Sequence, residues 1–153
     1  QMRRESNIAI GQNAGKDDLI RSGNQHSALD RKTILVVEDI SSNYLLISAM
    51  LSKHYNLLHA VNGEQAVAMV KEYKIDLLLM DMKMPVMDGL TATAEIRKFD
   101  TNIPIVALTA HAFESDKVAA LKSGCNDYLV KPVDKARLMS VLRKYCHPST
   151  LVL

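Results

Sequence analysis

The chain of 153 residues has no tryptophan, and aromatic residues make up only 5% of it. Its two cysteines, Cys125 and Cys146, lie far apart and form no C-x-x-C pair, which fits a reducing compartment and ordinary buried thiols. No apolar stretch approaches the roughly 20 residues that a membrane-spanning helix needs. The formal net charge is only +2, so charge points to no nucleic-acid or membrane partner.

Residues 1–32 also lack a regular pattern. They contain few large apolar residues, and no amphipathic period runs through them. We therefore expect a linker or tail from an upstream module at 1–32, one globular domain at 33–146 and a C-terminal tail at 147–153. Because the chain begins at Gln1 and not at Met, we expect it to be a piece of a longer protein. The final HPSTLVL is too short for a DNA-binding output domain.

From Thr33 onward, short apolar runs alternate with segments of helical spacing. The predicted strands cover 33–37, 55–60, 75–80, 103–109 and 127–130, and the predicted helices cover about 41–52, 63–73, 87–98, 113–123 and 134–146. Most runs lack the apolar–polar alternation of a one-sided sheet, which indicates strands buried on both faces. The strict βα order predicts an α/β fold with a doubly wound, five-stranded parallel sheet and helices on both faces.

Capping residues support these helix boundaries. Candidate N-cap or first-turn residues stand before four of the helices: Ser41-Ser42, Asn62-Gly63, Asp88 and Asp134. Gly124 follows the fourth predicted helix, where a glycine commonly ends a helix. Asp88-Gly89 is accordingly interpreted as a structural turn and cap, not as a ligand.

Polar residues stand at the carboxyl ends of the predicted strands, where sites form in such sheets. They are Glu38-Asp39 after the first strand, Asp81 after the third, Thr109 at the end of the fourth and Lys131-Pro132 after the fifth. Crowded carboxylates repel one another at neutral pH unless a cation lies among them, and an all-oxygen cluster suits a hard ion such as Mg²⁺. The set therefore predicts a Mg²⁺ site for phosphoryl chemistry.

Asp81 is the predicted nucleophile, because a carboxylate can attack a phosphoryl group and hold it as an acyl phosphate. Lys131 and the Thr109 hydroxyl would neutralise or hydrogen-bond the phosphoryl oxygens as charge spreads over them. For an isolated aspartate after an apolar run, helix capping is the simpler explanation. The other polar residues expected at the same edge favour the chemical role.

The sequence resembles the receiver domains of two-component response regulators over about residues 32–146. Four motifs carry the resemblance, in the family's order and at about its spacing: ILVVED, LLLMDMKMPVMDGL, IVALTA and YLVKP. It implies a flavodoxin-like (βα)5 fold with Asp81 as the phosphoacceptor and Mg²⁺ held by Asp39, Asp81 and the backbone carbonyl of Lys83. Glu38 replaces the more usual aspartate of the acidic pair and would reach the ion through water.

The resemblance also implies a conformational switch. The Thr109 hydroxyl would turn towards the phosphate, and the Tyr128 ring would move inward into the vacated space. A cis bond between Lys131 and Pro132 is expected as well. Taken alone, Tyr128 would be interpreted as an ordinary half-buried strand aromatic.

The segments MDMKMPVMDGL, ALTAHAF and GCNDYLVKPV are most similar to receivers fused to hybrid sensor histidine kinases. This resemblance implies a cytoplasmic phosphorelay module from a bacterium, within a parent chain that is a histidine kinase. The module itself is expected not to be an enzyme, apart from gaining and losing its own phosphoryl group. The expected partners are a kinase phosphohistidine domain and a histidine phosphotransfer domain. No nucleic-acid or membrane contact by this stretch is expected, and a homodimer is left open.

Three other functions stay open at this point. A stand-alone, single-domain response regulator would carry the same residues. A haloacid-dehalogenase-like phosphatase also uses an aspartate at the end of a parallel strand, but it needs a second acid two residues on, where this chain has Lys83. An interaction domain that has lost phosphate acceptance is the third, although all the expected groups are present.

Overall fold

The computed structural model describes residues 31–147, so the predicted linker and C-terminal tail lie almost wholly outside the described residues. The strands are β1 (Thr33–Val37), β2 (Asn56–Ala60), β3 (Leu77–Asp81), β4 (Ile105–Thr109) and β5 (Asp127–Val130). The helices are α2 (Ser41–Leu51), α3 (Gly63–Glu72), α4 (Gly89–Arg97), α5 (Glu114–Ser123) and α6 (Lys135–Cys146). Strands and helices alternate strictly, as the apolar pattern predicts.

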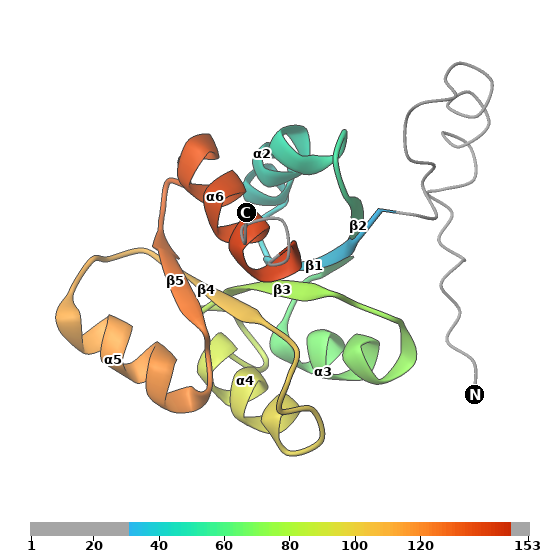
Figure 1. Ribbon diagram of the computed structural model, residues 1–153. Helices are drawn as coiled ribbons and strands as arrows, with labels where there is room; N and C mark the ends of the chain where they lie inside the picture. Colours follow the sequence, from blue (N-terminus) through green and yellow to red (C-terminus); the bar gives the residue numbers. More distant parts are fainter. Residues whose placement is uncertain (1–30, 148–153) are drawn as a thin grey trace.

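The five strands form one parallel sheet in the order β2-β1-β3-β4-β5. Helices α2 and α6 cover one face, and α3, α4 and α5 cover the other (Figure 1). The predicted doubly wound α/β fold is therefore confirmed. The chain moves outward from β1 to β2 and then returns to place β3 on the other side of β1, so a switch point lies between β1 and β3.

The unbroken apolar run of β3 fills both layers of the core. Leu77 and Leu79 pack on the α2 and α6 side, whereas Leu78 and Met80 pack on the side of the other three helices. All four side chains are fully buried. Each such side chain contributes roughly 1.5–3 kcal/mol through burial, which is why this strand shows no polar alternation.

Three predicted boundaries are wrong by two residues: the strand expected from residue 75 begins at Leu77, and the other two differences have local reasons. The helix expected from residue 87 begins at Gly89, because the Asp88 side chain accepts a hydrogen bond from the Thr91 N–H and acts as the N-cap. The strand expected from residue 103 begins at Ile105, because Pro104 has no N–H to offer a ladder.

Three other capping predictions agree with the structure, whereas Ser41 and Ser42 lie in the first turn of α2 and neither is its N-cap, which is Ile40 without a side-chain capping bond. Asn62 and Asp134 accept hydrogen bonds from the N–H groups of the first turns of α3 and α6. Gly124 ends α5 with a φ of 118°, a left-handed conformation that suits glycine. The peptide bond before Pro132 is cis, as predicted. Between residues 31 and 147, no helix has both the length and the apolar character needed to cross a bilayer.

Candidate functional site

The strand register brings two acidic residues side by side at the carboxyl edge of the sheet. Val37 of β1 pairs with Met80 of β3. Glu38 follows Val37, and Asp81 follows Met80, so both carboxylates emerge at the same level on neighbouring strands. Because the strand order reverses between β1 and β3, this edge is the crevice in which ligands bind in open α/β sheets.

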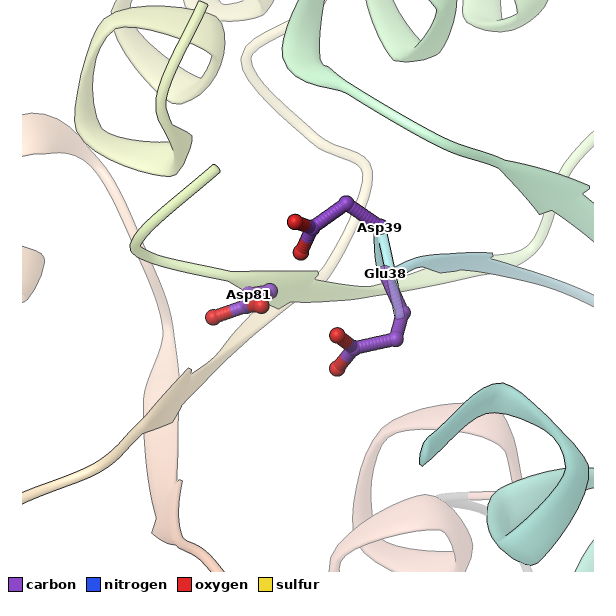
Figure 2. Close-up of side chains that lie close together, drawn as sticks. All are labelled: Glu38, Asp39 and Asp81. Atoms are coloured by element: carbon purple, nitrogen blue, oxygen red, sulfur yellow. The ribbon is translucent and has the colours of Figure 1, made fainter. Parts of the chain in front are cut away.

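Glu38, Asp39 and Asp81 form a compact acidic cluster. Each offers a carboxylate oxygen, and these oxygens all lie within 4.8 Å of one another. Glu38 and Asp39 extend to opposite sides of the backbone, with Asp81 beside them (Figure 2). Glu38 and Asp81 are buried, at 0% and 5% exposure, while Asp39 is open to solvent. Three hard oxygen donors at this spacing suit Mg²⁺.

Lys131 supplies the positive charge at the cluster. Its Nζ lies 3.1 Å from Glu38 Oε1 and 3.2 Å from Asp81 Oδ2, and its side chain is 23% exposed. Burial lowers the pKa of Lys131, but the charges of Asp81 and Glu38 outweigh that effect, so the net pKa is raised. The ammonium therefore stays charged beside the two carboxylates.

Asp81 is a more basic carboxylate than an exposed aspartate. Burial raises the pKa of Asp81, the hydrogen bond from the Lys83 N–H lowers it, the charge of Glu38 raises it, and Lys131 lowers it. The net pKa is raised. The Lys83 N–H donates to Asp81 Oδ1 at 3.2 Å, while the Lys83 side chain is exposed. The predicted metal contact of the Lys83 carbonyl stays a prediction.

Besides Lys131, three groups contact the carboxylate and the carbonyl of Glu38. Its Oε2 accepts a hydrogen bond from the Ile40 N–H at 3.2 Å and a longer one from Asn43 Nδ2 at 3.4 Å. Its backbone carbonyl lies 2.8 Å from His59 Nε2. The sequence interpretation missed Asn43 and His59. An asparagine in the first turn of α2, shortly after the acidic pair, was a weak signal for the first, and no sequence signal pointed to His59.

Thr109 ends β4 next to Asp81, because Leu108 pairs with Asp81 in the sheet, and Tyr128 lies on the neighbouring strand β5. The buried Thr109 hydroxyl donates to the His111 carbonyl at 2.7 Å. Tyr128 is partly buried against the core beneath α3, α4 and α5, with Lys117 Nζ 4.9 Å from its ring centroid. Thr109 follows two residues after Ala107, which packs in that same core, so the two residues proposed for a switch share a face of the sheet.

The loop after Asp81 is tightly held. The Met87 N–H donates to the Pro85 carbonyl at 2.7 Å across Val86, whose φ is 70°, and this is a γ-turn of the rarer, strained kind. A Cβ on Gly89 would lie 2.3 Å from the Asp81 carbonyl oxygen. Glycine at this close approach therefore lets the loop fold back against the end of β3.

Comparison with known proteins gives a consistent result. Residues 34–143 match the response regulator receiver domain family. The chain is 41% identical over 119 residues to hybrid signal transduction histidine kinase M of Dictyostelium discoideum, a match that covers 72% of this chain and 5% of that protein. The chain thus spans a small part of this curated relative.

Two solved structures share the fold and more than a third of the aligned sequence. The receiver domain of sensor histidine kinase PA1611 from Pseudomonas aeruginosa, with magnesium in its active-site cleft, has a TM-score of 0.72 and 39% identity, covering 76% of this chain and 98% of that one. The second is from Saccharomyces cerevisiae, a complex of the histidine phosphotransfer protein Ypd1 with the receiver domain of the response regulator Ssk1. It has a TM-score of 0.75 and 35% identity, and the match covers 80% of this chain and 93% of that one. These relatives include eukaryotes, so similarity does not restrict the chain to bacteria.

Proposed function

Because the chain belongs to the response regulator receiver domains of two-component signalling, we propose that it accepts a phosphoryl group from a phosphohistidine onto Asp81, with Mg²⁺. One observation carries the proposal. The Asp81 carboxylate ends the central strand, within 4.8 Å of two other carboxylate oxygens and 3.2 Å from the Lys131 ammonium. A nucleophile, an acidic donor set for a cation and a fixed positive charge thus share one crevice.

The transfer step follows from the chemistry of these groups. An oxygen of Asp81 attacks phosphorus, and the new O–P bond forms as the P–N bond to the donor histidine breaks. The imidazole leaves with the bonding electron pair and takes up a proton from water. Burial makes Asp81 more basic than an exposed aspartate, which favours attack. The Lys131 ammonium, once released from its contact with the Asp81 carboxylate, would lie close enough to neutralise a phosphoryl oxygen.

The donor set fits a divalent cation. Asp39, Asp81 and the Lys83 carbonyl would hold Mg²⁺. When bound there, the ion would neutralise negative charge on the phosphoryl oxygens. Both carboxylate oxygens of Glu38 already accept hydrogen bonds from protein groups. This engagement supports a contact of Glu38 with the ion through water. The magnesium in the cleft of the PA1611 receiver domain supports the same choice of ion.

The proposal predicts Mg²⁺-dependent phosphorylation by a small-molecule donor. Incubation with acetyl phosphate and MgCl₂ is expected to add one phosphoryl group per chain, measured by intact mass and released by hydroxylamine, which cleaves acyl phosphates. In EDTA the mass is expected to stay unchanged. A hydroxylamine-resistant phosphate, or equal labelling in EDTA, would contradict the proposal.

We also propose that phosphorylation moves Thr109 and Tyr128. The Thr109 hydroxyl would leave the His111 carbonyl for a phosphoryl oxygen, and Tyr128 would turn further into the core it already borders. Addition of beryllofluoride and Mg²⁺ to the unphosphorylated protein should shift the NMR signals of the Tyr128 ring, whereas addition of Mg²⁺ alone should not. Unchanged ring signals on full beryllofluoride binding would exclude this switch.

The proposed protein partner is a histidine phosphotransfer domain that contacts α2. This helix contains no charged residue and exposes Leu45 at 63% and Leu46 at 54%, and its N-cap Ile40 is also apolar and 50% exposed. Ile40 directly follows the acidic pair, so this apolar surface is continuous with the reaction edge. The yeast complex of a receiver domain with Ypd1 supports this kind of partner.

Leu45→Glu is expected to slow phosphoryl transfer from a phosphorylated protein donor by about ten-fold or more, since it puts a charge into an apolar contact. Phosphorylated Ypd1 serves as the protein donor and acetyl phosphate as the small one. Labelling by acetyl phosphate should not change, because the small donor needs no docking surface. Leu121→Glu on α5, which replaces a leucine of 48% exposure, is the matched control. Equal transfer rates in the two variants would exclude α2 as the contact.

We further propose that the parent protein is a cytoplasmic or membrane-anchored hybrid sensor histidine kinase, and that this stretch acts as its acceptor and is not itself an enzyme. The 41% identity to a hybrid histidine kinase supports this context. A stand-alone response regulator is the alternative. The full-length gene separates the two, because only a hybrid kinase encodes a histidine kinase core in the same chain.

A further inference from the structure

The stacked rings of Tyr44 and His59 have no part in the phosphoryl chemistry described above. We propose that this pair positions the acidic residues Glu38 and Asp39 by holding the peptide group that joins these two residues, and that it thereby sets the affinity of the site for Mg²⁺. The inference rests on the proposed function, because it concerns the same cation site. His59 and Tyr44 are positioning residues in this account, since neither reaches the cluster directly.

His59 replaces a hydrogen bond that the sheet can no longer make. Along β1 and β2 the parallel ladder runs to the pair Val37 and Ala60, and the Glu38 N–H still donates to the Ala60 carbonyl at 3.0 Å. In a continued parallel ladder the Asn62 N–H would donate to the Glu38 carbonyl. However, β2 ends at Ala60, and Asn62 already serves as the N-cap of α3, accepting from the Gln65 N–H at 2.8 Å.

The Glu38 carbonyl is therefore satisfied by a side chain. His59 Nε2 lies 2.8 Å from that oxygen, and a carbonyl can only accept, so Nε2 must carry the proton. The backbone of Glu38 is then held on both sides, at its N–H by the Ala60 carbonyl and at its carbonyl, in the peptide group that leads to Asp39, by the imidazole. Since Asp39 begins with this peptide group, both carboxylates take their direction from it.

Tyr44 fixes the orientation of the imidazole. The two ring centroids are 3.9 Å apart, and the planes differ by only 7°. A stacked ring of this kind restricts rotation of the histidine side chain, so less entropy is lost when Nε2 binds the carbonyl.

Substitutions separate the hydrogen bond from the stacking. His59→Phe keeps an aromatic ring against Tyr44 and removes the donor, so Mg²⁺ binding is expected to weaken by about ten-fold, as for other residues that orient metal ligands. His59→Gln places an amide nitrogen near the position of Nε2 and should restore wild-type affinity to within about two-fold. His54→Phe, at an exposed histidine outside the site, is the control and should bind as wild type does.

The Mg²⁺ dissociation constant is measured by NMR titration of the amide signals, with thermal unfolding in EDTA as the stability readout. A structural role alone would lower the melting temperature of His59→Phe and leave its Mg²⁺ affinity near that of the wild type, and this result would overturn the inference. So would equal weakening in His59→Gln and His59→Phe, because the donor would then not matter.

A second readout needs no metal. Nitrogen-15 NMR of the histidine rings in the wild-type chain is expected to show His59 protonated on Nε2, with slow exchange of that proton. A neutral His59 protonated on Nδ1 would exclude the clamp, whatever the site binds. If the wild-type chain bound no Mg²⁺ while His59 showed the expected Nε2 proton, the proposed metal site would fail and the clamp would remain as a backbone contact without a role in cation binding.

Discussion

Asp81→Asn is expected to abolish phosphoryl acceptance and, at neutral pH, to make the unphosphorylated domain more stable than the wild type. The amide cannot act as the nucleophile, so no hydroxylamine-labile phosphate should form. The gain in stability follows from the raised pKa of Asp81, whose largest cause is burial. Asn retains an oxygen for the Lys83 N–H, and Lys131 keeps its contact with Glu38.

The stability gain should depend on pH in a defined direction. An aspartate whose folded pKa lies above its unfolded value of 3.8 binds more protons in the folded state, so the wild type loses stability as the pH rises through the folded pKa. The difference between Asp81→Asn and wild type should therefore be small below that unfolded value and grow towards neutral pH. Chemical unfolding in EDTA at a series of pH values measures it.

Asp88→Asn is the matched control for the loss of phosphorylation. Asp88 caps α4 by accepting from the Thr91 N–H, and asparagine caps about equally well. This variant should accept phosphate at the wild-type level. If Asp81→Asn still gained a hydroxylamine-labile phosphate, another carboxylate would be the acceptor and the assignment of Asp81 would be wrong.

Lys131→Met is expected to destabilise the domain by about 3 kcal/mol at neutral pH, because removal of one partner leaves buried carboxylates without their counter-charge. Glu38 is fully buried and Asp81 nearly so, and both contact the ammonium. Mg²⁺ should return part of the lost stability, since it binds the folded carboxylates. Phosphorylation by acetyl phosphate should also slow, because a phosphoryl oxygen loses its ammonium partner.

The pH dependence of Lys131→Met has a clear sign. The deficit should be smallest in acid, where the carboxylates are protonated, and should grow as they ionise. In the wild type, the raised pKa of Lys131 means that its contribution is fully present below the unfolded value of 10.5 and is lost as the pH rises through the folded pKa.

Lys98→Met provides the control for an exposed ion pair. Lys98 contacts Glu95 at 3.0 Å on the surface of α4, with side-chain exposures of 70% and 40%. Its loss should cost about 0.5 kcal/mol or less. Equal effects of the two substitutions in urea unfolding would show that the Lys131 contacts add nothing beyond a surface pair.

Local patterns carried most of the fold prediction. The apolar run IDLLLM (75–80) predicted a strand buried on both faces, because a strand of a parallel sheet covered by helices has no solvent face on which to place polar residues. The caps at Asn62, Asp88 and Asp134 were predictable because each acts within three residues of itself. The predicted start of β4 was two residues too early, because an apolar pattern takes no account of the N–H that Pro104 lacks.

The sequence alone determined the strand–helix order and which polar residues end each strand, since both follow from short-range periodicity. Only the tertiary structure decided that Lys131 meets Glu38 across 93 positions of sequence and that His59 holds the Glu38 carbonyl across 21. The physical reason is that strand order, register and the turn of β2 away from β1 arise from pairing between distant segments. The periodicity of one segment does not determine which other segment it will pair with.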